Sequence, residues 1–252
     1  MSELTGELEI WQSNDLVEAV QTLSLNEKRL VLAAAALHDP RKPLPPKGTV
    51  TLHAEEFAEV FGIESRGHVY EALQDAAARL GERWIRNIVK GPRGSYQRNV
   101  RWVWLIEYRK GEGTVVIGFS PGVAPYLTLL HQRFTRFKLK QIGAIGTMHG
   151  LRLYELMAQY RVAGDRTIKL ERLREILDLG DKYADIKNLR VRVLDPAIAE
   201  INKHTDLRVT MTPERKGRKV TGFHFAIKQD TQIPLDLPMP DVESEERLAG
   251  GG

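Results

Sequence analysis

The side chains with the clearest capacity for specific recognition lie between residues 181 and 203, where basic and amide residues alternate with an apolar stripe. An arginine fork pairs with guanine O6 and N7, an asparagine amide pairs with adenine N6 and N7, and a lysine suits a phosphate. Lys187, Asn188, Arg190 and Arg192 supply these groups. The cluster predicts a helix that enters the major groove of DNA. The alternative is a basic helix that only faces solvent.

An apolar stripe is what would hold this helix against the protein. Its members recur at the three- and four-residue spacing of one helix face, and they are Ile186, Leu189, Val193, Ala197 and Ile201. We therefore predict a long helix from about residue 186 to residue 203. Lys182, just ahead of it, is counted in the same DNA-binding set.

A second basic element follows the helix. Two β-type runs, at 207–212 and 220–228, flank a loop at 213–219. A loop at a hairpin tip can reach an adjacent groove or the phosphate backbone. We predict that this wing contacts DNA through its four basic residues, which are Arg215, Lys216, Arg218 and Lys219.

The charge of the chain is unevenly distributed, although its total is only +4. Residues 1–120 hold 15 basic and 16 acidic residues, residues 121–228 hold 21 and 11, and residues 229–252 hold 1 and 6. A concentration of positive charge displaces counterions from nucleic-acid phosphates, which supplies most non-specific affinity. The second part of the chain is therefore the expected DNA-binding part, and the proline-containing acidic tail is expected to be disordered.

The predicted elements fall into two similar series. In each, helices around a glycine break precede a β-hairpin, which is the order of a winged helix. We predict an α+β fold of two tandem winged-helix domains, residues 1–120 and 121–228, followed by the tail 229–252. The predicted helices are 25–37, with Ser24 and Glu27 in a capping box, then 54–61, 66–83, 124–134, 147–160, 171–177 and 186–203. The further β runs are 49–52, 84–90, 100–109, 114–120 and 167–170.

The first domain is predicted to have a secondary DNA role. Arg66 and His68 open its second helix, and Arg93 and Arg98 lie on its hairpin, where they can contact phosphates. Because the net charge of this half is −1, we expect it to serve also as a protein interface.

Several classes of function lack their signatures in this chain. There is no G-x-x-x-x-G-K-[ST] phosphate loop, no H-E-x-x-H pair and no cysteine, so we expect no cofactor, no metal site and no enzyme activity. No apolar run approaches the roughly 20 residues that cross a membrane, and the start of the chain lacks a secretion signal. We expect no membrane contact and a cytoplasmic location.

Several segments resemble the Rep initiators of iteron-containing bacterial plasmids. The similarity covers about residues 11–228, and the segments that carry it are Ser13–Ala19, Leu23–Leu30, Arg152–Leu156 with Tyr160, and Glu200–Asn202 before Thr205 and Asp206. The resemblance implies two winged-helix domains, of which the second reads repeated origin DNA. The segment Asp185–Arg192 fits the family's recognition helix, although Val191 stands where some members have a basic residue.

The resemblance also implies partners: double-stranded origin DNA, a homodimer in equilibrium with the monomer, the host initiator, the replicative helicase and chaperones. Our hypothesis is a non-enzymatic plasmid replication initiator that binds repeated sites (iterons), helps open the duplex and represses its own gene as a dimer. A tandem winged-helix transcription repressor is the main alternative. A rolling-circle nicking enzyme is a second, which the histidine spacing argues against.

Overall fold

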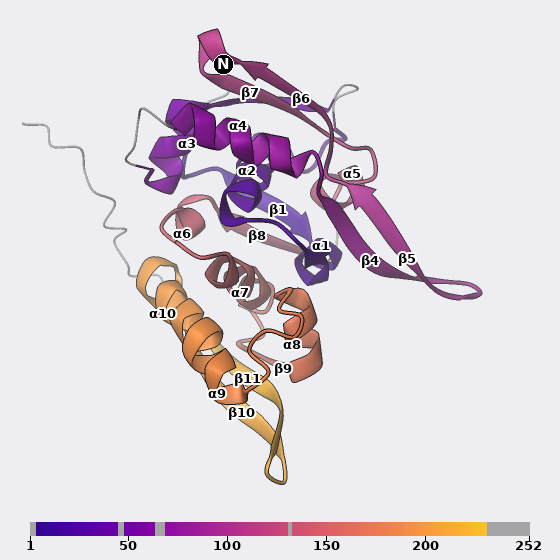
Figure 1. The fold of residues 1–252 in the computed structure, drawn as a ribbon, viewed down its shortest axis with the longest axis vertical. Helices are drawn as coiled ribbons and strands as arrows, with labels where there is room; N and C mark the ends of the chain where they lie inside the picture. Colours follow the sequence, from indigo (N-terminus) through magenta and orange to yellow (C-terminus); the bar gives the residue numbers. More distant parts are fainter. Residues whose placement is uncertain (1–3, 45–47, 64–68, 131–132, 231–252) are drawn as a thin grey trace, which may run out of the picture.

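The computed structural model describes residues 4–44, 48–63, 69–130 and 133–230, and it shows two winged-helix units in tandem (Figure 1). Within these ranges, helices are combined with four small antiparallel sheets. The predicted fold class is therefore confirmed. The predicted tail lies outside the described residues from 231 onward.

The first unit packs its helices against two three-stranded sheets, β2-β4-β5 and β3-β7-β6. Its first long helix begins at the predicted capping box: Ser24 Oγ accepts from the Glu27 N–H at 3.3 Å, and the Glu27 carboxylate accepts from the Ser24 N–H at 3.2 Å. The next helix ends at Gly62, whose φ of +60° favours glycine. The elements are α1 (Asn14–Glu18), β2 (Val20–Gln21), α2 (Leu25–Ala36), β3 (Thr49–His53), α3 (Ala54–Phe61), α4 (Val69–Leu80), β4 (Trp84–Gly91), β5 (Gly94–Arg101), β6 (Val103–Arg109) and β7 (Thr114–Phe119), with a 3-10 turn at Lys110–Glu112.

The hairpin of this unit differs from the prediction in two ways. β4 and β5 pair out to Gly91 and Gly94, so only Pro92 and Arg93 remain as the turn where a longer loop was expected. The predicted run 100–109 is also split at Trp102, whose side chain is fully buried. Because this indole fills the core, the chain crosses there from one sheet to the other.

The predicted helix at 124–134 is wrong over most of its length. Among the described residues of this range, only α5 (Ala124–Leu127) is helical, and Leu129 has a left-handed φ of 53°. Residues that follow form β8 (Phe134–Lys138), which pairs with β1 (Glu9–Ser13), an unpredicted strand. The ring of Trp11 stacks on Phe134 at 4.5 Å. A partner more than a hundred residues away thus overrides the local helical spacing.

The β1–β8 sheet and one central helix tie the two halves of the chain together. α7 (Met148–Ala158) packs on α1 and α2 on one side and on α10 on the other, and α6 (Lys140–Gly143) precedes it. The buried apolar residues of both halves form one continuous core. The division after residue 120 stays a prediction, and the β1–β8 pair spans it.

The second unit has the predicted order of elements with a longer hairpin. Its sheet runs β10-β11-β9, and the hairpin strands pair to Lys216 and Lys219, so the turn holds only Gly217 and Arg218. Gly217 has a φ of +61°, which suits this tight turn. The elements are β9 (Asp165–Lys169), α8 (Leu170–Ile176), α9 (Ile186–Leu189), a π-helical segment (Arg190–Leu194), α10 (Asp195–His204), β10 (Leu207–Lys216) and β11 (Lys219–Gln229).

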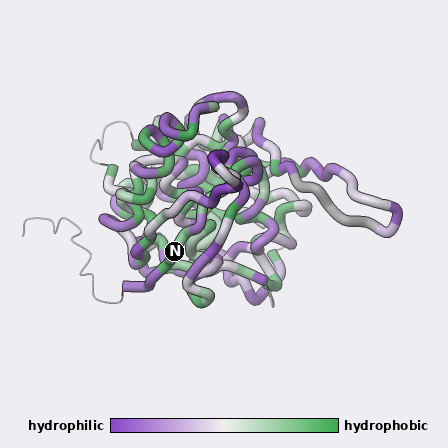
Figure 2. The backbone as a smooth tube through the Cα atoms, turned by 90° about the horizontal axis from the view of Figure 1, so that it is seen from below, coloured by the Kyte–Doolittle hydropathy of each residue, from purple (hydrophilic) through white to green (hydrophobic). Residues whose placement is uncertain are grey.

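Two hairpins project from the body. We call β4–β5 the arm and β10–β11 the wing. The arm stands clear of the core in the end-on view, where apolar residues gather inside the body (Figure 2). The wing extends past the α9 end of the long helix (Figure 1). In the described part of the chain, no helix is long and apolar enough to span a membrane.

Candidate nucleic-acid interface

The predicted recognition helix is present as one continuous rod from Ile186 to His204. A π-helical turn interrupts its regular bonding just before Pro196. Proline has no N–H to donate to the residue four positions back, so the ladder widens there. The predicted inward face is confirmed: Leu189, Val193, Ala197 and Ile201 are buried, and Ile186 is half-buried.

The opposite face of this helix is exposed and cationic. Lys187, Asn188, Arg190 and Arg192 are all exposed, as the prediction required. Arg190 reaches Asp195 at 3.6 Å, but both groups remain open to solvent. Across the described residues, the side chains of Lys187, Asn188 and Arg192 have no hydrogen-bond or ion-pair partner. They are free to meet a ligand.

Two sets of hydrogen bonds hold the start of the helix in place. Asp185 Oδ1 accepts a hydrogen bond from the Asn188 N–H at 2.9 Å, which caps the first turn. The preceding loop is bound by the guanidinium of Arg174, which donates hydrogen bonds to the carbonyl oxygens of Gly180 at 2.6 Å, Lys182 at 2.6 Å and Tyr183 at 2.9 Å. The first turn of the cationic face therefore has a fixed position.

Arg174 is a site residue that the sequence analysis missed. It lies on α8, in a segment that reads as an ordinary charged helix, and its role depends on a loop that folds back over it. Gly180 and Tyr183 both have a left-handed φ, 52° and 56°. Gly180 in this short loop was the available signal of an unusual turn. Lys182, predicted as a contact, is exposed in the same loop.

The wing places the other predicted cations beside the helix. Residues 214–219 are all exposed, and Lys216 lies directly opposite Lys219 in the strand register. Like charges facing each other across a hairpin destabilise it unless an anion lies nearby. A β-bulge between Glu214 and Arg215 bends the strand just before the tip. Such a tip suits a phosphate backbone better than another basic surface.

Arg93 and Arg98, the predicted residues of the first unit that the structure describes, lie apart from this surface. Arg93 and Arg98 are exposed on the arm, and Arg98 donates to the Tyr96 hydroxyl at 3.1 Å. The arm leaves the body at a different place from the wing (Figure 1). Its sequence from residue 83 to residue 106 contains no acidic residue. Arg66 and His68 lie outside the described residues.

A buried charged cluster underlies both units, and the sequence analysis did not identify it as a cluster. Lys28 Nζ lies 2.7 Å from Glu155 Oε1, and Arg152 lies 2.6 Å from Glu155 Oε2. Gln12 donates to the same carboxylate at 2.8 Å, and Lys28 donates to Gln21 at 3.0 Å. The sequence signal of this cluster is the presence of charged residues on helix faces that are otherwise apolar.

The electrostatics of this cluster follow from its burial. The side chains of Lys28 and Glu155 have no exposure, so desolvation lowers the pKa of Lys28 to about 8. Burial acts to raise the pKa of Glu155, but the charges of Lys28 and Arg152 outweigh it and hold that pKa below its ordinary value. The buried Glu155 carboxylate is therefore the counter-ion of both Lys28 and Arg152.

The described residues include no group of three or more histidine, aspartate or glutamate side chains that could hold a metal ion. The surface that remains as a candidate site is the exposed face of the long helix together with the wing. Its chemistry is that of hydrogen-bond donors and positive charge directed at an anionic, groove-shaped partner.

Comparisons with known proteins give a consistent result. The family model described as Initiator Replication protein, WH1, matches residues 9–158, and Initiator Rep protein, WH2, matches residues 169–227. A replication initiation protein of Escherichia coli is 23% identical over 91% of this chain and 72% of its own length. The PI protein of Escherichia coli is 23% identical over 91% of this chain and 86% of its own length.

A solved structure shares the fold of almost the whole chain. The crystal structure of the Pi initiator protein in complex with iteron DNA superposes with a TM-score of 0.78, at 24% identity, over 90% of this chain and 99% of that chain. Both winged-helix units and their connection are therefore an arrangement that is also observed by experiment in a similar protein.

Proposed function

This chain belongs to the family of initiator replication proteins, and from that premise we propose that it binds repeated sites in origin DNA and starts plasmid replication there. The second unit reads the bases through its long helix, and the wing contacts the neighbouring backbone. The arm adds phosphate contacts from the first unit. The protein acts through binding energy and assembly and catalyses no reaction itself.

The observation that carries this proposal is the pairing of a free cationic helix face with a cationic wing. Arg192 and Lys187 are exposed without partners among the described residues, and Lys216 faces Lys219 at the wing tip. Like charges directly opposite each other destabilise a hairpin, and an anionic partner at the tip would offset that cost. The double helix offers phosphates for the wing and base edges for the helix at the same time.

Two further parts of the proposal concern assembly. We propose that the protein exists as a monomer that initiates and as a homodimer that represses its own gene, with the first unit at the dimer interface. The host initiator, the replicative helicase and chaperones are the partners that would follow origin binding. Sedimentation of the full chain over a range of concentrations measures the dimer, and a strictly monomeric protein contradicts that part.

The experiment for the main proposal is a footprint of the purified protein on DNA that flanks its own gene. We expect protection of several repeats of one sequence in tandem. A plasmid that carries only the gene and this flanking DNA should then be maintained in a host that supports it. Protection of a single promoter site, with no plasmid maintenance, would instead identify a transcription repressor.

A nicking initiator is tested separately on supercoiled origin DNA with magnesium. We expect the DNA to remain supercoiled and intact, because the spacing of the histidines does not supply the His-rich metal site that a nicking initiator needs. A site-specific nick would contradict the non-enzymatic part of the proposal and leave the DNA-binding part standing.

A further inference from the structure

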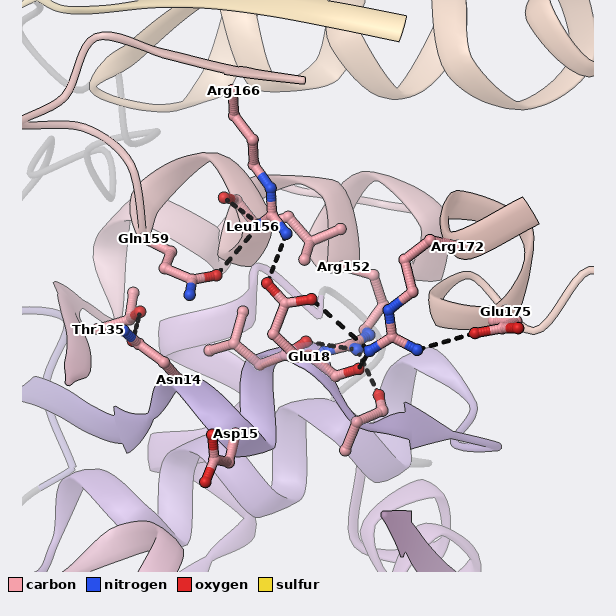
Figure 3. Close-up of polar contacts among 12 residues, drawn as sticks. Asn14, Asp15, Glu18, Thr135, Arg152, Leu156, Gln159, Arg166, Arg172 and Glu175 are labelled. Carbon is pink, nitrogen blue, oxygen red and sulfur yellow. Dashed lines mark hydrogen bonds and ion pairs between the residues drawn. The ribbon is translucent and has the colours of Figure 1, made fainter. Parts of the chain in front are cut away.

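Glu18, at the end of α1, joins the first unit to the second. Its Oε1 accepts a hydrogen bond from Arg166 of β9 at 2.5 Å, and its Oε2 lies 3.7 Å from Arg172 of α8. Figure 3 shows the two guanidinium groups converging on this one carboxylate. A single anion of the first unit is thus bound by two cations that both lie in elements of the second.

The backbone around Glu18 is held as firmly as its side chain. Arg172 also donates to the Glu18 carbonyl at 2.7 Å. Arg152 of the central helix donates to the carbonyl oxygens of Val17 and Ala19, each at 2.9 Å. Charge-assisted bonds from planar guanidinium groups fix geometry as well as adding energy. Residues 17–19 are therefore anchored from three different elements.

The two arginines are themselves restrained. Arg166 donates to Gln159 Oε1 at 3.1 Å and lies over the ring of Tyr160 at 4.5 Å, and its side chain is only 9% exposed. Arg172 donates to Glu175 at 2.9 Å. The Glu18–Arg166 pair is partly buried, with side chains 26% and 9% exposed, so it is screened less than a surface pair, whereas the Arg172 side chain is 42% exposed. The contact is thus built more rigidly than an ordinary surface salt bridge.

The anchored segment continues directly into the base of the arm. Ala19 is followed by β2, in which Val20 pairs with Arg86 and Gln21 pairs with Ile85 of β4. On the other side, β9 pairs with the wing strand β11, and α8 carries Arg174, which grips the loop before the long helix. Glu18 therefore lies on a short path between the two basic regions of the protein.

We propose that Glu18 is a positioning residue that sets the orientation of the arm relative to the long helix and the wing, so that all three contact one DNA duplex. The inference rests on the proposed DNA-binding function. Two contact surfaces joined rigidly act as one bivalent ligand, because the second contact forms at high effective concentration. Without the carboxylate contacts of Glu18, the direction of the arm becomes less fixed, and the arm adds less to affinity.

The first experiment needs no DNA. The chain contains no cysteine, so spin labels can be placed only where they are introduced, at Ser95→Cys on the arm and Lys203→Cys on α10, both exposed positions. Pulsed EPR should give a narrow distance distribution in the otherwise unchanged protein. Glu18→Gln should broaden or shift it. An unchanged distribution in Glu18→Gln overturns the proposal.

Matched variants separate positioning from general damage. Asp15→Asn removes a carboxylate from the same helix, but Asp15 is 72% exposed and lies 3.9 Å from Arg133, outside the Glu18 contacts in Figure 3, so it should leave the distribution narrow. Arg172→Gln loosens the contact from the other side and should broaden the distribution less than Glu18→Gln. Broadening by Asp15→Asn to the same extent contradicts a specific role for Glu18.

The second experiment is a cycle of variants on DNA. In the parent protein, Arg93→Ala with Arg98→Ala should weaken binding about fivefold to tenfold at low salt. In the Glu18→Gln background, the same arm change should cost less than twofold, whereas Arg192→Ala should still weaken binding fully. Equal losses from the arm change in both backgrounds overturn the positioning role. Loss of all effect of Arg192→Ala instead overturns the proposed function, and the EPR result stands independently of it.

Discussion

Arg152 and Arg192 are the same residue type in two regions of the molecule, and their surroundings use the positive charge in opposite ways. Arg152 is 2% exposed, and its guanidinium pairs with Glu155 and with two carbonyl oxygens. Arg192 is exposed and has no partner in the part of the chain that the structure describes. The buried cation stabilises the fold, and the exposed cation is available for a ligand. Charge counts along a sequence cannot separate these two uses.

The largest effect is expected in the buried region. Glu155→Gln leaves Lys28 and Arg152 without an anion in a dry site, so the free energy of unfolding should fall by about 3–5 kcal/mol. Urea denaturation measures it. Glu112→Gln, which alters an exposed pair with Arg109, should change stability by less than about 0.5 kcal/mol. Similar losses from both variants would contradict the distinction between the two regions.

The pH dependence of stability gives the next largest effect. The pKa of Lys28 is about 8 in the folded protein and 10.5 when unperturbed, so the unfolded chain binds more protons between these values. The free energy of unfolding should therefore rise with pH across this window, by at most about 3 kcal/mol from this group. Lys28→Met should lack that rise. Denaturation at pH 7.5 and pH 9.5 gives the change in the free energy of unfolding with pH for both proteins. An equal change in both would show that Lys28 is not the source of the rise.

Removal of an exposed cation should act on DNA and leave the fold intact. Arg192→Ala should weaken binding to the specific site by about 1–3 kcal/mol, because a base contact is lost, and should leave stability unchanged. Titration against specific and random duplexes measures both affinities, with Lys110→Ala as the control at an exposed site of the first unit. An equal loss on random DNA would show that Arg192 does not read bases.

Arg174 combines features of both regions, since it bonds to protein groups and yet holds the loop before the proposed DNA-reading helix. Arg174→Ala removes three hydrogen bonds to the loop before the long helix, so affinity for the specific site should fall about tenfold, or about 1.4 kcal/mol. Random DNA should be bound within twofold of the parent. Arg174→Lys should restore only part of the loss, because an ammonium lacks the planar fork. Full rescue by lysine would contradict this role.

The smallest effects are expected on the two hairpins. Lys216→Ala in the wing should weaken binding to all sequences alike and reduce the slope of log affinity against log salt by about one. Arg98→Ala in the arm should do the same to a smaller extent, about twofold to threefold at low salt. Salt titrations on one duplex compare them. A sequence-dependent loss at either position would move that residue from backbone contact to base reading.

Local signals in the sequence were sufficient where the chemistry is local. The capping box at Ser24, the inward stripe from Leu189 to Ile201 and the basic wing were all predicted from neighbouring residues, and the structure contains them. The predicted helix at 124–134 failed because β8 forms only through its pairing with β1. The hydrogen bonds of Arg174 likewise form only after the loop before the long helix has folded back over α8.

The sequence by itself determined most of the elements, the concentration of positive charge after residue 120 and the amphipathic helix that presents it, because spacing and capping act within a few residues. Only the tertiary structure decided which charges are buried and which stay free, and which arginines hold Glu18. Those outcomes depend on residues that are far apart in the chain and meet only after folding, where burial removes the water that would otherwise screen them.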